Sequence, residues 1–349
     1  MGWREHQETL ASHGAASASR LWQPEPVPTP RVVCCGEALV DLIGADRTGR
    51  TWHAAPGGSP YNAAVAAGRL GAPTSFLGVL SDDRFGQLLR DHLDGSHVSW
   101  RTCPITTEPT TLAVVTQGPD DLEPSFAFHV VGTTTVSSRT IDLHLPADTG
   151  VLHVSGSMAL VLEPAASRIE ALLAAARHRT LVHLDPNPRP TVAGGRERYL
   201  ARLDRWLGLA DVVKVSAADV EWIEPGANPL ELAQRWLTSD IDTDSDDSDG
   251  PAAVVITRGA KGAAVVCGAG VVEVAPSRSI EVVDTVGAGD TFAGAMLAAF
   301  AAHGVTDRRA LADLDEHWWH TALTFAVEAA GIACSRVGAD PPWRRELQH

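Results

Sequence analysis

Residues 282–296 read VVDTVGAGDTFAGAM, which predicts the end of a strand, a glycine-rich turn and the start of a helix of small residues. Gly287 and Gly289 let the backbone approach a ligand closely and adopt dihedral angles that other residues avoid. We expect the amides of Gly287, Ala288 and Gly289 to point outward at the helix N-terminus, where unpaired amides and the helix dipole bind anions. Asp290 lies in the same turn, so the segment predicts an anion site with a carboxylate beside it.

This pairing of groups suits phosphoryl transfer to an alcohol. The reaction needs a base near the attacking hydroxyl and hydrogen-bond donors near the transferred phosphate. A simpler interpretation is an aspartate that caps a helix after a glycine turn. The P-loop pattern GxxxxGK[ST] does not occur, and the third glycine of the dinucleotide pattern GxGxxG is missing, which disfavours an NAD-dependent oxidoreductase.

The length, net charge and cysteine content of the chain limit the classes of protein to which it can belong. The chain has 349 residues, enough for one large α/β domain or two ordinary ones. Its formal net charge of -15 would repel the phosphates of nucleic acid. The five cysteines show no CxxC spacing, which argues against a disulfide framework or a zinc site and fits the cytoplasm. No apolar run reaches the length of a membrane span, and residues 1–30 lack a signal-peptide layout and are predicted to be a flexible leader.

Strand-like and helix-like runs alternate along the chain. The strand-like runs are residues 31–43, 74–80, 151–156, 180–187, 210–216 and 252–257, and the helix-like runs are residues 60–71, 83–93, 163–178, 231–237, 291–304 and 320–335. The alternation predicts an α/β fold in which helices cover both faces of a mostly parallel sheet. Ligands of such folds bind beyond the carboxyl ends of the strands.

Three segments interrupt the alternation. Residues of about 43–56 and 100–135 look β-rich, and we expect them to pair into a small sheet that covers a cleft. Residues 239–250, SDIDTDSDDSDG, lack the spacing and the terminal glutamate of an EF-hand. They are predicted to form an acidic, disordered loop.

Two motifs far apart in the chain resemble the signatures of one family. DTVGAGDTFAGA (284–295) is similar to the C-terminal signature of the PfkB (ribokinase-like) carbohydrate kinases, and PGGSPYNAAVAAGRLG (56–71) is similar to their N-terminal signature. GEALVDLI (36–43) resembles the first strand of fructokinase-like members. The resemblance implies a ribokinase-like kinase domain over residues 31–342. Its fold would be a three-layer α/β/α sandwich with a central, mostly parallel sheet and a small β-sheet lid.

The resemblance also implies a sugar pocket beside the glycine turn. Asp290 is the expected catalytic base, which takes the proton of the hydroxyl that is phosphorylated, and the amides of residues 287–289 form the anion hole. The aspartate after the first strand binds sugar hydroxyls in this family, and a carboxylate can accept two of them. The expected sugar-binding residues are Asp41, Gly57, Gly58, Asn62, Gly156, Ser157 and Asp290.

Three further segments resemble the family's nucleotide site. DPNPR (185–189) is similar to a fructokinase segment, and TRGAKG (257–262) is similar to a nucleotide-binding turn. KVSAAD (214–219) resembles the element that orders magnesium-bound water near ATP, with an aspartate in place of the usual glutamate. The implied cofactors are ATP and Mg²⁺. The expected cofactor-binding residues are Asp185, Asn187, Arg189, Lys214, Ser216, Asp219, Thr257, Arg258, Gly259, Gly262 and Gly289.

Members of this family often bind a monovalent cation beside the anion hole. The matching residues, which would contribute mostly backbone carbonyls, are Asp284, Val286, Ala333, Arg336 and Gly338. Pro342 stands where the family usually has a serine, so a K⁺ site would lack one hydroxyl ligand.

The sequence therefore predicts a cytoplasmic, ATP-dependent sugar kinase, with D-fructose and fructose 6-phosphate as the favoured substrate and product. Ribose, 2-keto-3-deoxygluconate and adenosine stay open as acceptors, and adenosine would need aromatic stacking on Phe126 and Phe128. An inactive sugar-binding protein on the same fold is the alternative of another class, and the intact Asp290 argues against it. No nucleic-acid or membrane partner is expected, and exposed β edges would permit a homodimer.

Overall fold

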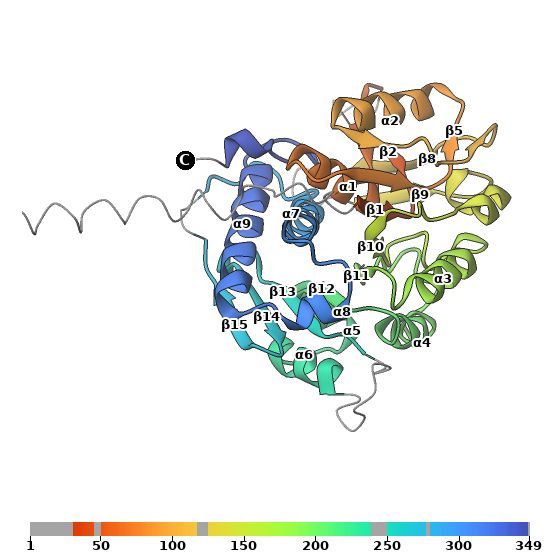
Figure 1. The fold of residues 1–349 in the computed structure, drawn as a ribbon. Coiled ribbons are helices and arrows are strands. Elements are labelled where there is room, and N and C mark those ends of the chain that lie inside the picture. The colour runs from red at the N-terminus through yellow and green to blue at the C-terminus, as the bar shows by residue number, and fades with distance from the viewer. Residues whose placement is uncertain (1–30, 45–49, 117–124, 239–249, 277–279, 348–349) are drawn as a thin grey trace, which may run out of the picture.

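A nine-stranded sheet forms the centre of the protein (Figure 1). The computed structural model describes residues 31–44, 50–116, 125–238, 250–276 and 280–347, so the predicted leader and nearly all of the acidic loop lie outside the described residues. Seven neighbouring strands are parallel, and the last two are antiparallel. Their order is β15 (Gly270–Val274), β14 (Ala263–Cys267), β13 (Ala253–Thr257), β12 (Val212–Ser216), β11 (Leu181–Asp185), β10 (Thr149–Ser155), β1 (Arg31–Cys35), β4 (Thr74–Leu77) and β6 (Val98–Ser99).

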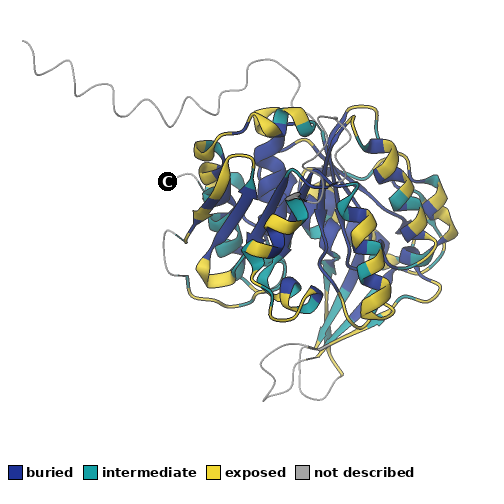
Figure 2. Ribbon diagram, turned by 90° about the horizontal axis from the view of Figure 1, so that it is seen from below, coloured by how far each residue is buried: buried dark blue, intermediate teal, exposed yellow. Residues whose placement is uncertain are grey.

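Helices cover both faces of this sheet. One face is covered by α1 (Ser59–Arg69), α2 (Arg84–Gly95), α7 (Ala288–His303), α8 (Arg308–Ala312) and α9 (Glu316–Cys334). The other is covered by α3 (Ala165–Ala176), α4 (Arg196–Leu207), α5 (Ala217–Ile223) and α6 (Pro229–Thr238). Successive strand residues point to opposite faces, so that Val32 and Cys34 join one core and Val33 and Cys35 the other. The predicted three-layer sandwich is confirmed, and Figure 2 shows its buried strands between helices with exposed outer faces.

A small sheet lies beside the large one. Its order is β3 (Trp52–Gly57), β2 (Leu39–Gly44), β8 (Thr111–Thr116) and β9 (Ser125–His129). The β2–β8 pair is parallel, and the two outer pairs are antiparallel. The remaining short elements are β5 (Leu80–Ser81), β7 (Ile105–Thr106) and the 3₁₀ turns at Thr134–Val136, Ser138–Asp142, Gly259–Lys261 and Arg344–Glu346.

The prediction of one strand over residues 31–43 is wrong. β1 ends at Cys35, and β2 begins at Leu39 in the other sheet. Between them, Gly36 has φ 150°, and the buried carboxylate of Glu37 accepts hydrogen bonds from the Ser157 hydroxyl and the Ala159 amide (3.0 Å). The buried side chain of Glu37 holds the chain where it crosses from the large sheet to the small one. The first strand of the small sheet therefore follows β1 after only three residues.

The prediction of a strand leading into the glycine turn is also wrong. Residues 280–285 form neither helix nor strand, and the amides of Val283 and Asp284 both donate to the carbonyl of Cys334, at 2.8 and 3.2 Å. The side chains of Val282 and Val283 are exposed. Apolar composition alone suggested a strand there, whereas this segment is held by the C-terminal end of α9.

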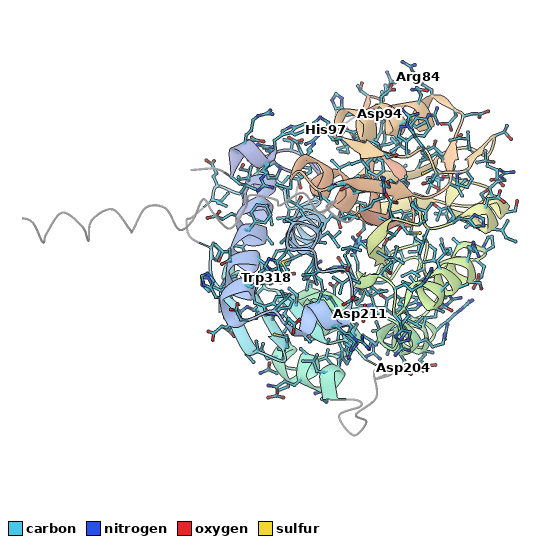
Figure 3. All side chains as sticks on the ribbon, in the orientation of Figure 1. Arg84, Asp94, His97, Asp204, Asp211 and Trp318 are labelled. Carbon is cyan, nitrogen blue, oxygen red and sulfur yellow. The ribbon has the colours of Figure 1, made fainter. Side chains whose placement is uncertain are left out.

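The two edges of the large sheet carry different polar groups. At the amino edge, Asp211 (labelled in Figure 3) accepts a hydrogen bond from the Val182 amide at 2.8 Å and lies 3.7 Å from Arg308 of α8, which attaches that helix to the sheet. At the carboxyl edge, Ser155 and Asp185 are register partners, as are Ser216 and Thr257. The predicted site residues Asp185, Ser216 and Thr257 therefore lie at the carboxyl edge.

Candidate active site

Asp290 lies in the first turn of α7, next to the first turn of α1. The two helices pack closely, because a Cβ atom on Gly294 would lie 2.5 Å from the Ala66 Cβ. This contact brings α1 donors to the carboxylate: the Ser59 hydroxyl donates to Oδ1 at 2.8 Å, and the Asn62 side-chain amide donates to Oδ2 at 2.9 Å. Both oxygens of Asp290 are therefore oriented by the same helix.

The glycine turn presents unpaired amides beside that carboxylate. Gly287 has φ 73°, a left-handed conformation that favours glycine, and its carbonyl accepts from the Thr291 amide at 2.8 Å. The Ala288 amide donates to the Thr285 carbonyl at 3.2 Å. In the part of the chain that the structure describes, no protein acceptor binds the amides of Gly287, Gly289 and Asp290. These three amides could form the anion cradle, whereas the Ala288 amide, which was predicted to belong to it, is paired within the turn.

A buried ion pair lies directly behind the turn. The Lys214 ammonium donates to Asp185 Oδ2 at 2.8 Å, and both side chains are at least 95% buried. A Cβ atom on Gly289 would lie 3.1 Å from Lys214 Nζ, so the ammonium faces the cradle. Burial alone would lower the Lys214 pKa, but the carboxylates of Asp185, Asp219 and Asp290 outweigh it and raise this pKa. The cradle therefore combines backbone donors with a fixed positive charge.

Asp41, which lies in the small sheet, interacts with the carboxylate of Asp290. A Cβ atom on Gly57 would lie only 2.3 Å from Asp41 Oδ2, so a larger residue there would displace the Asp41 carboxylate. Burial and the charge of Asp290 raise the Asp41 pKa to about 7, while Arg189 opposes the rise. Arg189 also opposes the raised pKa of Glu37, which links this exposed arginine to the sugar side of the site.

The other predicted sugar residues are close by but already in contact with protein groups. Ser157 is 3% exposed, and its hydroxyl donates to Glu37. Cβ atoms on Gly58 and Gly156 would lie 2.6 Å from the Glu37 carbonyl oxygen and 2.2 Å from the Pro186 carbonyl oxygen. These three residues are packed against protein groups, and a direct contact of each with a sugar stays a prediction.

The side chain of Asn187 faces Ser59 of α1. Its side-chain amide donates to the Ser59 hydroxyl at 2.8 Å and lies 3.5 Å from the Ser155 hydroxyl. Asn187 has φ 38° and is 8% exposed. Its predicted contact with the nucleotide is untested, and its observed contact leads to Asp290 through Ser59.

Ser216 and Asp219 form the capping box of α5. The Ser216 hydroxyl and amide donate to Asp219 Oδ2 at 2.6 and 2.9 Å, and the Asp219 amide donates to the Ser216 hydroxyl at 3.0 Å. Among the described residues, nothing donates to the second carboxylate oxygen of Asp219. One acidic oxygen is therefore left for water or a metal ion.

The turn at residues 257–262 connects β13 and β14, an antiparallel pair. Thr257 lies at the carboxyl edge beside Ser216. Gly259 and Gly262 have φ 56° and 80°, and the Arg258 guanidinium donates to the Ala263 carbonyl and to Glu273, both at 3.3 Å. The turn is therefore a β-hairpin, and the contacts of its residues with the nucleotide stay a prediction.

The residues that were predicted to bind a monovalent cation lie in two loops, which hydrogen bonds join to each other. Asp284 Oδ1 accepts from the Val286 amide at 3.0 Å, and its Oδ2 accepts from the Gly338 amide at 2.8 Å. The Ala333 carbonyl accepts from the Arg336 amide at 3.1 Å, and the Arg336 side chain binds Asp340 and Glu346. The described residues contain no cluster of three histidine, cysteine or acidic side chains that could hold a metal ion.

Sequence reasoning missed Ser59. It lies within the quoted signature, three positions before Asn62, and this helical spacing puts both side chains on one face of α1. The spacing could have revealed the pair, but only the contact between α1 and α7 shows that both bind Asp290.

Comparison with known proteins decides the family. Residues 29–345 match the pfkB family of carbohydrate kinases. The chain belongs to this family. A fructokinase of Rhizobium leguminosarum bv. trifolii is 37% identical over 290 residues, which are 82% of this chain and 84% of the relative. A fructokinase of Klebsiella pneumoniae is 32% identical over 316 residues, 90% of this chain and 96% of the relative. The prediction of a carbohydrate kinase is confirmed.

Solved structures of the pfkB-like fold agree with this assignment. The fructokinase of Xylella fastidiosa with bound ATP has a TM-score of 0.79 and 27% identity, covering 91% of this chain and 98% of that one. A fructokinase double mutant of Vibrio cholerae O395, in a form with fructose, ADP and potassium ion bound, has a TM-score of 0.74 and 28% identity, covering 89% and 94%. None of the helices within the described residues of this pfkB kinase is long and apolar enough to cross a membrane.

Proposed function

We propose that this kinase transfers the γ-phosphate of ATP to D-fructose and forms fructose 6-phosphate. One observation carries the proposal: Asp290 lies between the polar first turn of α1 and the unpaired amides of Gly287 and Gly289, with the Lys214 ammonium behind them. A base for a hydroxyl and a cradle for a phosphate thus meet at one helix end. The choice of fructose as the sugar rests on the similarity to fructokinases.

The site residues account for each part of the transfer. Asp290 accepts the proton of the attacking hydroxyl, whose oxygen forms the new bond to phosphorus as the bond to the ADP oxygen breaks. The amides of Gly287, Gly289 and Asp290 donate to the phosphate oxygens, and Lys214 offsets their charge. Because these donors are fixed by the fold, they need little reorganisation during the reaction.

The residues that are expected to bind the nucleotide suit a Mg²⁺ ion that keeps several of its water ligands. Asp219 keeps one carboxylate oxygen without a hydrogen bond, and the described residues offer no cage of three acidic ligands. Mg²⁺ commonly keeps several waters and is held by one or two carboxylates together with substrate phosphates. When bound, it would neutralise phosphate charge; Asp219 and Ser216 would hold its water.

A K⁺ site would lie on the loop pair next to the cradle. Asp284 ties together Val286 and Gly338 through two hydrogen bonds, which gathers backbone carbonyls near the start of α7. Such a site is proposed at Asp284, Val286, Ala333, Arg336 and Gly338, and the Vibrio cholerae fructokinase has a potassium-bound form. The ion would stabilise the loop that carries the unpaired amides.

The charged side chains around the proposed sugar position favour an acceptor that carries no charge. Asp41 and Asp290 interact repulsively, and Arg189 is the cation that lowers the Asp41 pKa. An acid such as 2-keto-3-deoxygluconate would bring a further negative charge to this pair. Adenosine is disfavoured for another reason: Phe126 and Phe128 stack on each other with ring centroids 6.0 Å apart.

The small sheet is proposed to act as a lid. It carries Asp41 and Gly57, so its closure over bound sugar would complete the pocket and exclude water, which competes as a phosphate acceptor. The outer strands β3 and β9 are edges that a second copy could pair with, as a homodimer. We propose the cytoplasm as its location, where ATP and free sugar are available.

The test is ADP release over a panel of acceptors: fructose, ribose, tagatose, 2-keto-3-deoxygluconate and adenosine. We expect fructose to give the highest kcat/KM, and phosphorus NMR to place the phosphate on the 6-hydroxyl. Preference for another acceptor would replace the proposed substrate but keep the kinase. Fructose binding in calorimetry without ADP release from any acceptor would support the inactive binding protein.

A further inference from the structure

We infer that Ser59 and Asn187 form a positioning relay for the catalytic base and thereby select Asp290 Oδ2 as the atom that takes the proton. This inference rests on the proposed kinase function. The relay is a chain of two hydrogen bonds in series: the Asn187 amide donates to the Ser59 hydroxyl at 2.8 Å, and that hydroxyl donates to Asp290 Oδ1 at 2.8 Å.

Burial distinguishes the two sides of the Asp290 carboxylate. On the Oδ1 side, Ser59 is 7% exposed and Asn187 is 8% exposed, so a sugar could not reach this oxygen without breaking the relay. On the Oδ2 side, Asn62 is partly exposed and is an expected sugar contact. A hydroxyl that takes the place of the Asn62 amide, or binds beside it, therefore meets Oδ2.

The relay is held rigid by its surroundings. Asn187 lies between Pro186 and Pro188, whose rings fix their own φ angles and restrict the residues before them. The left-handed backbone at Asn187, with φ 38°, is one that asparagine tolerates better than most residues. Ser59 is the first residue of α1 and is followed by Pro60, so its backbone is also restricted.

The Ser59 hydroxyl has a single proton, which fixes the direction of the relay. Asn187 can only donate through its amide nitrogen, so the hydroxyl accepts there and turns its proton toward Oδ1. Replacing Asn187 would let that hydroxyl rotate, whereas replacing Ser59 would remove the contact with Oδ1 altogether. The structure therefore predicts a larger effect at Ser59 than at Asn187.

Other charges around Asp290 are unaffected by these substitutions. They come from three elements: Asp41 of β2, Asp185 of β11 and Lys214 of β12. A change in kcat after a substitution in the relay can then be assigned to the lost hydrogen bond.

The first arm of the test is kinetic, with fructose as acceptor. We expect Ser59→Ala to lower kcat by about 10- to 100-fold, because a misplaced group loses reactivity steeply, with the KM for fructose within about threefold of wild type. Ser59→Thr, which keeps the hydroxyl, should retain most of the activity.

A double variant tests whether the two residues act in series. Asn187→Gly tolerates the left-handed backbone and should give a smaller loss of kcat than Ser59→Ala. Ser59→Ala combined with Asn187→Gly should be at most about threefold worse than Ser59→Ala alone, because the second contact acts only through the first. Multiplying losses in the double variant would overturn the relay.

Ser75→Ala is the matched control. Ser75 is 3% exposed and accepts a hydrogen bond from Arg31 at 3.0 Å, but it lies at the amino end of β4, away from the site. It should leave kcat and the KM for fructose unchanged. A Ser59→Ala variant with wild-type kcat would contradict the inference.

The second arm needs no turnover: crystal structures of wild type and of Ser59→Ala at similar resolution. We expect the Asp290 carboxylate to rotate or to occupy two orientations in the variant. An unchanged single orientation would show that Asn62 and the helix suffice and would overturn the relay. If wild type releases no ADP with any sugar, the proposed function fails, and this structural comparison alone decides the positioning.

Discussion

The large and small sheets contribute different kinds of group to one site. The large sheet is buried on both faces between helices, and it fixes Asp185 and Lys214, while α7 against it fixes Asp290. The small sheet is partly exposed, and it contributes Asp41 and the glycine that makes room for this side chain. In the proposed function, the rigid part holds the groups of the chemical step, and the exposed part holds a group for the sugar.

This comparison predicts a separation of kinetic effects. Substitutions at the edge of the large sheet should lower kcat, because they remove interactions made in the transition state. Substitutions in the small sheet should mainly raise the KM for the sugar. The variants below test this separation, from the largest expected effect to the smallest.

The largest effect is expected at the base. Asp290→Asn keeps the size of the side chain but removes the proton acceptor, so kcat should fall by about 10³-fold or more. The melting temperature and the affinity for fructose should stay close to wild type. ADP release and calorimetry measure the two quantities. Near-normal turnover would show that another group takes the proton and that the rigid part does not supply the base.

The second largest effect is expected for Lys214→Met, which should lower both kcat and the free energy of unfolding. The substitution leaves Asp185 as a buried, unpaired charge, which typically destabilises a protein by about 3–5 kcal/mol. It also removes the cation behind the cradle, so kcat should fall by about 100-fold.

A matched double variant separates these two causes. Lys214→Met with Asp185→Asn removes the whole ion pair and should recover much of the stability in urea unfolding. If kcat stays low, the ammonium acts on the phosphate, as the comparison requires. If kcat recovers together with stability, Lys214 only supports the fold.

The buried part of the molecule was also the part that sequence predicted best. The alternation of apolar strands and helices set the three layers correctly, because burial on both faces produces continuous apolar runs. The two signatures placed Asp290 and Asn62 in one family site. Local composition could not show that residues 31–43 divide between two sheets, since the cause is the distant contact of Glu37 with Ser157 and Ala159.

The same limit applies within the site. Motif matching assigned Asn187 to the nucleotide, which stays a prediction, but it could not show the hydrogen bond from Asn187 to Ser59. That contact depends on where α1 begins beside the end of β11. Motif matching also included the Ala288 amide in the cradle, although the Thr285 carbonyl occupies it. Spacing along the chain predicts which residues share an edge or a face. It does not predict which hydrogen bonds they make with each other.

Gly57→Ala tests the small sheet. The added Cβ would lie 2.3 Å from Asp41 Oδ2, so the carboxylate must move away from its position. We expect the KM for fructose to rise by about tenfold and kcat to change by less than about threefold, since the misplaced group binds the sugar rather than the reacting proton. Gly44→Ala is the control, because its Cβ would meet only the Trp52 ring at 3.8 Å. A fall in kcat at constant KM would break the proposed division between the sheets.

The smallest effect concerns pH, and it too depends on Asp41. Because burial and Asp290 raise the Asp41 pKa to about 7, the carboxylate that accepts sugar hydroxyls becomes protonated as the pH falls below 7, and fructose affinity should fall with it. A raised folded-state pKa means that the folded protein holds this proton more tightly than the unfolded chain does. Stability is therefore lost as the pH rises from about 4 to 7.

Asp41→Asn should remove both pH dependences. The variant should bind fructose more weakly at pH 8. Its free energy of unfolding in urea at that pH should exceed that of wild type by up to about 4 kcal/mol, since one pKa unit corresponds to about 1.4 kcal/mol. Asp290→Asn gives the complementary measurement, because Asp290 is one cause of the raised pKa. Calorimetry with fructose should then show the affinity of that variant falling only at lower pH than in wild type. An unmoved profile would mean that the two carboxylates do not share a site, and the small sheet would not be the sugar-binding part of the kinase.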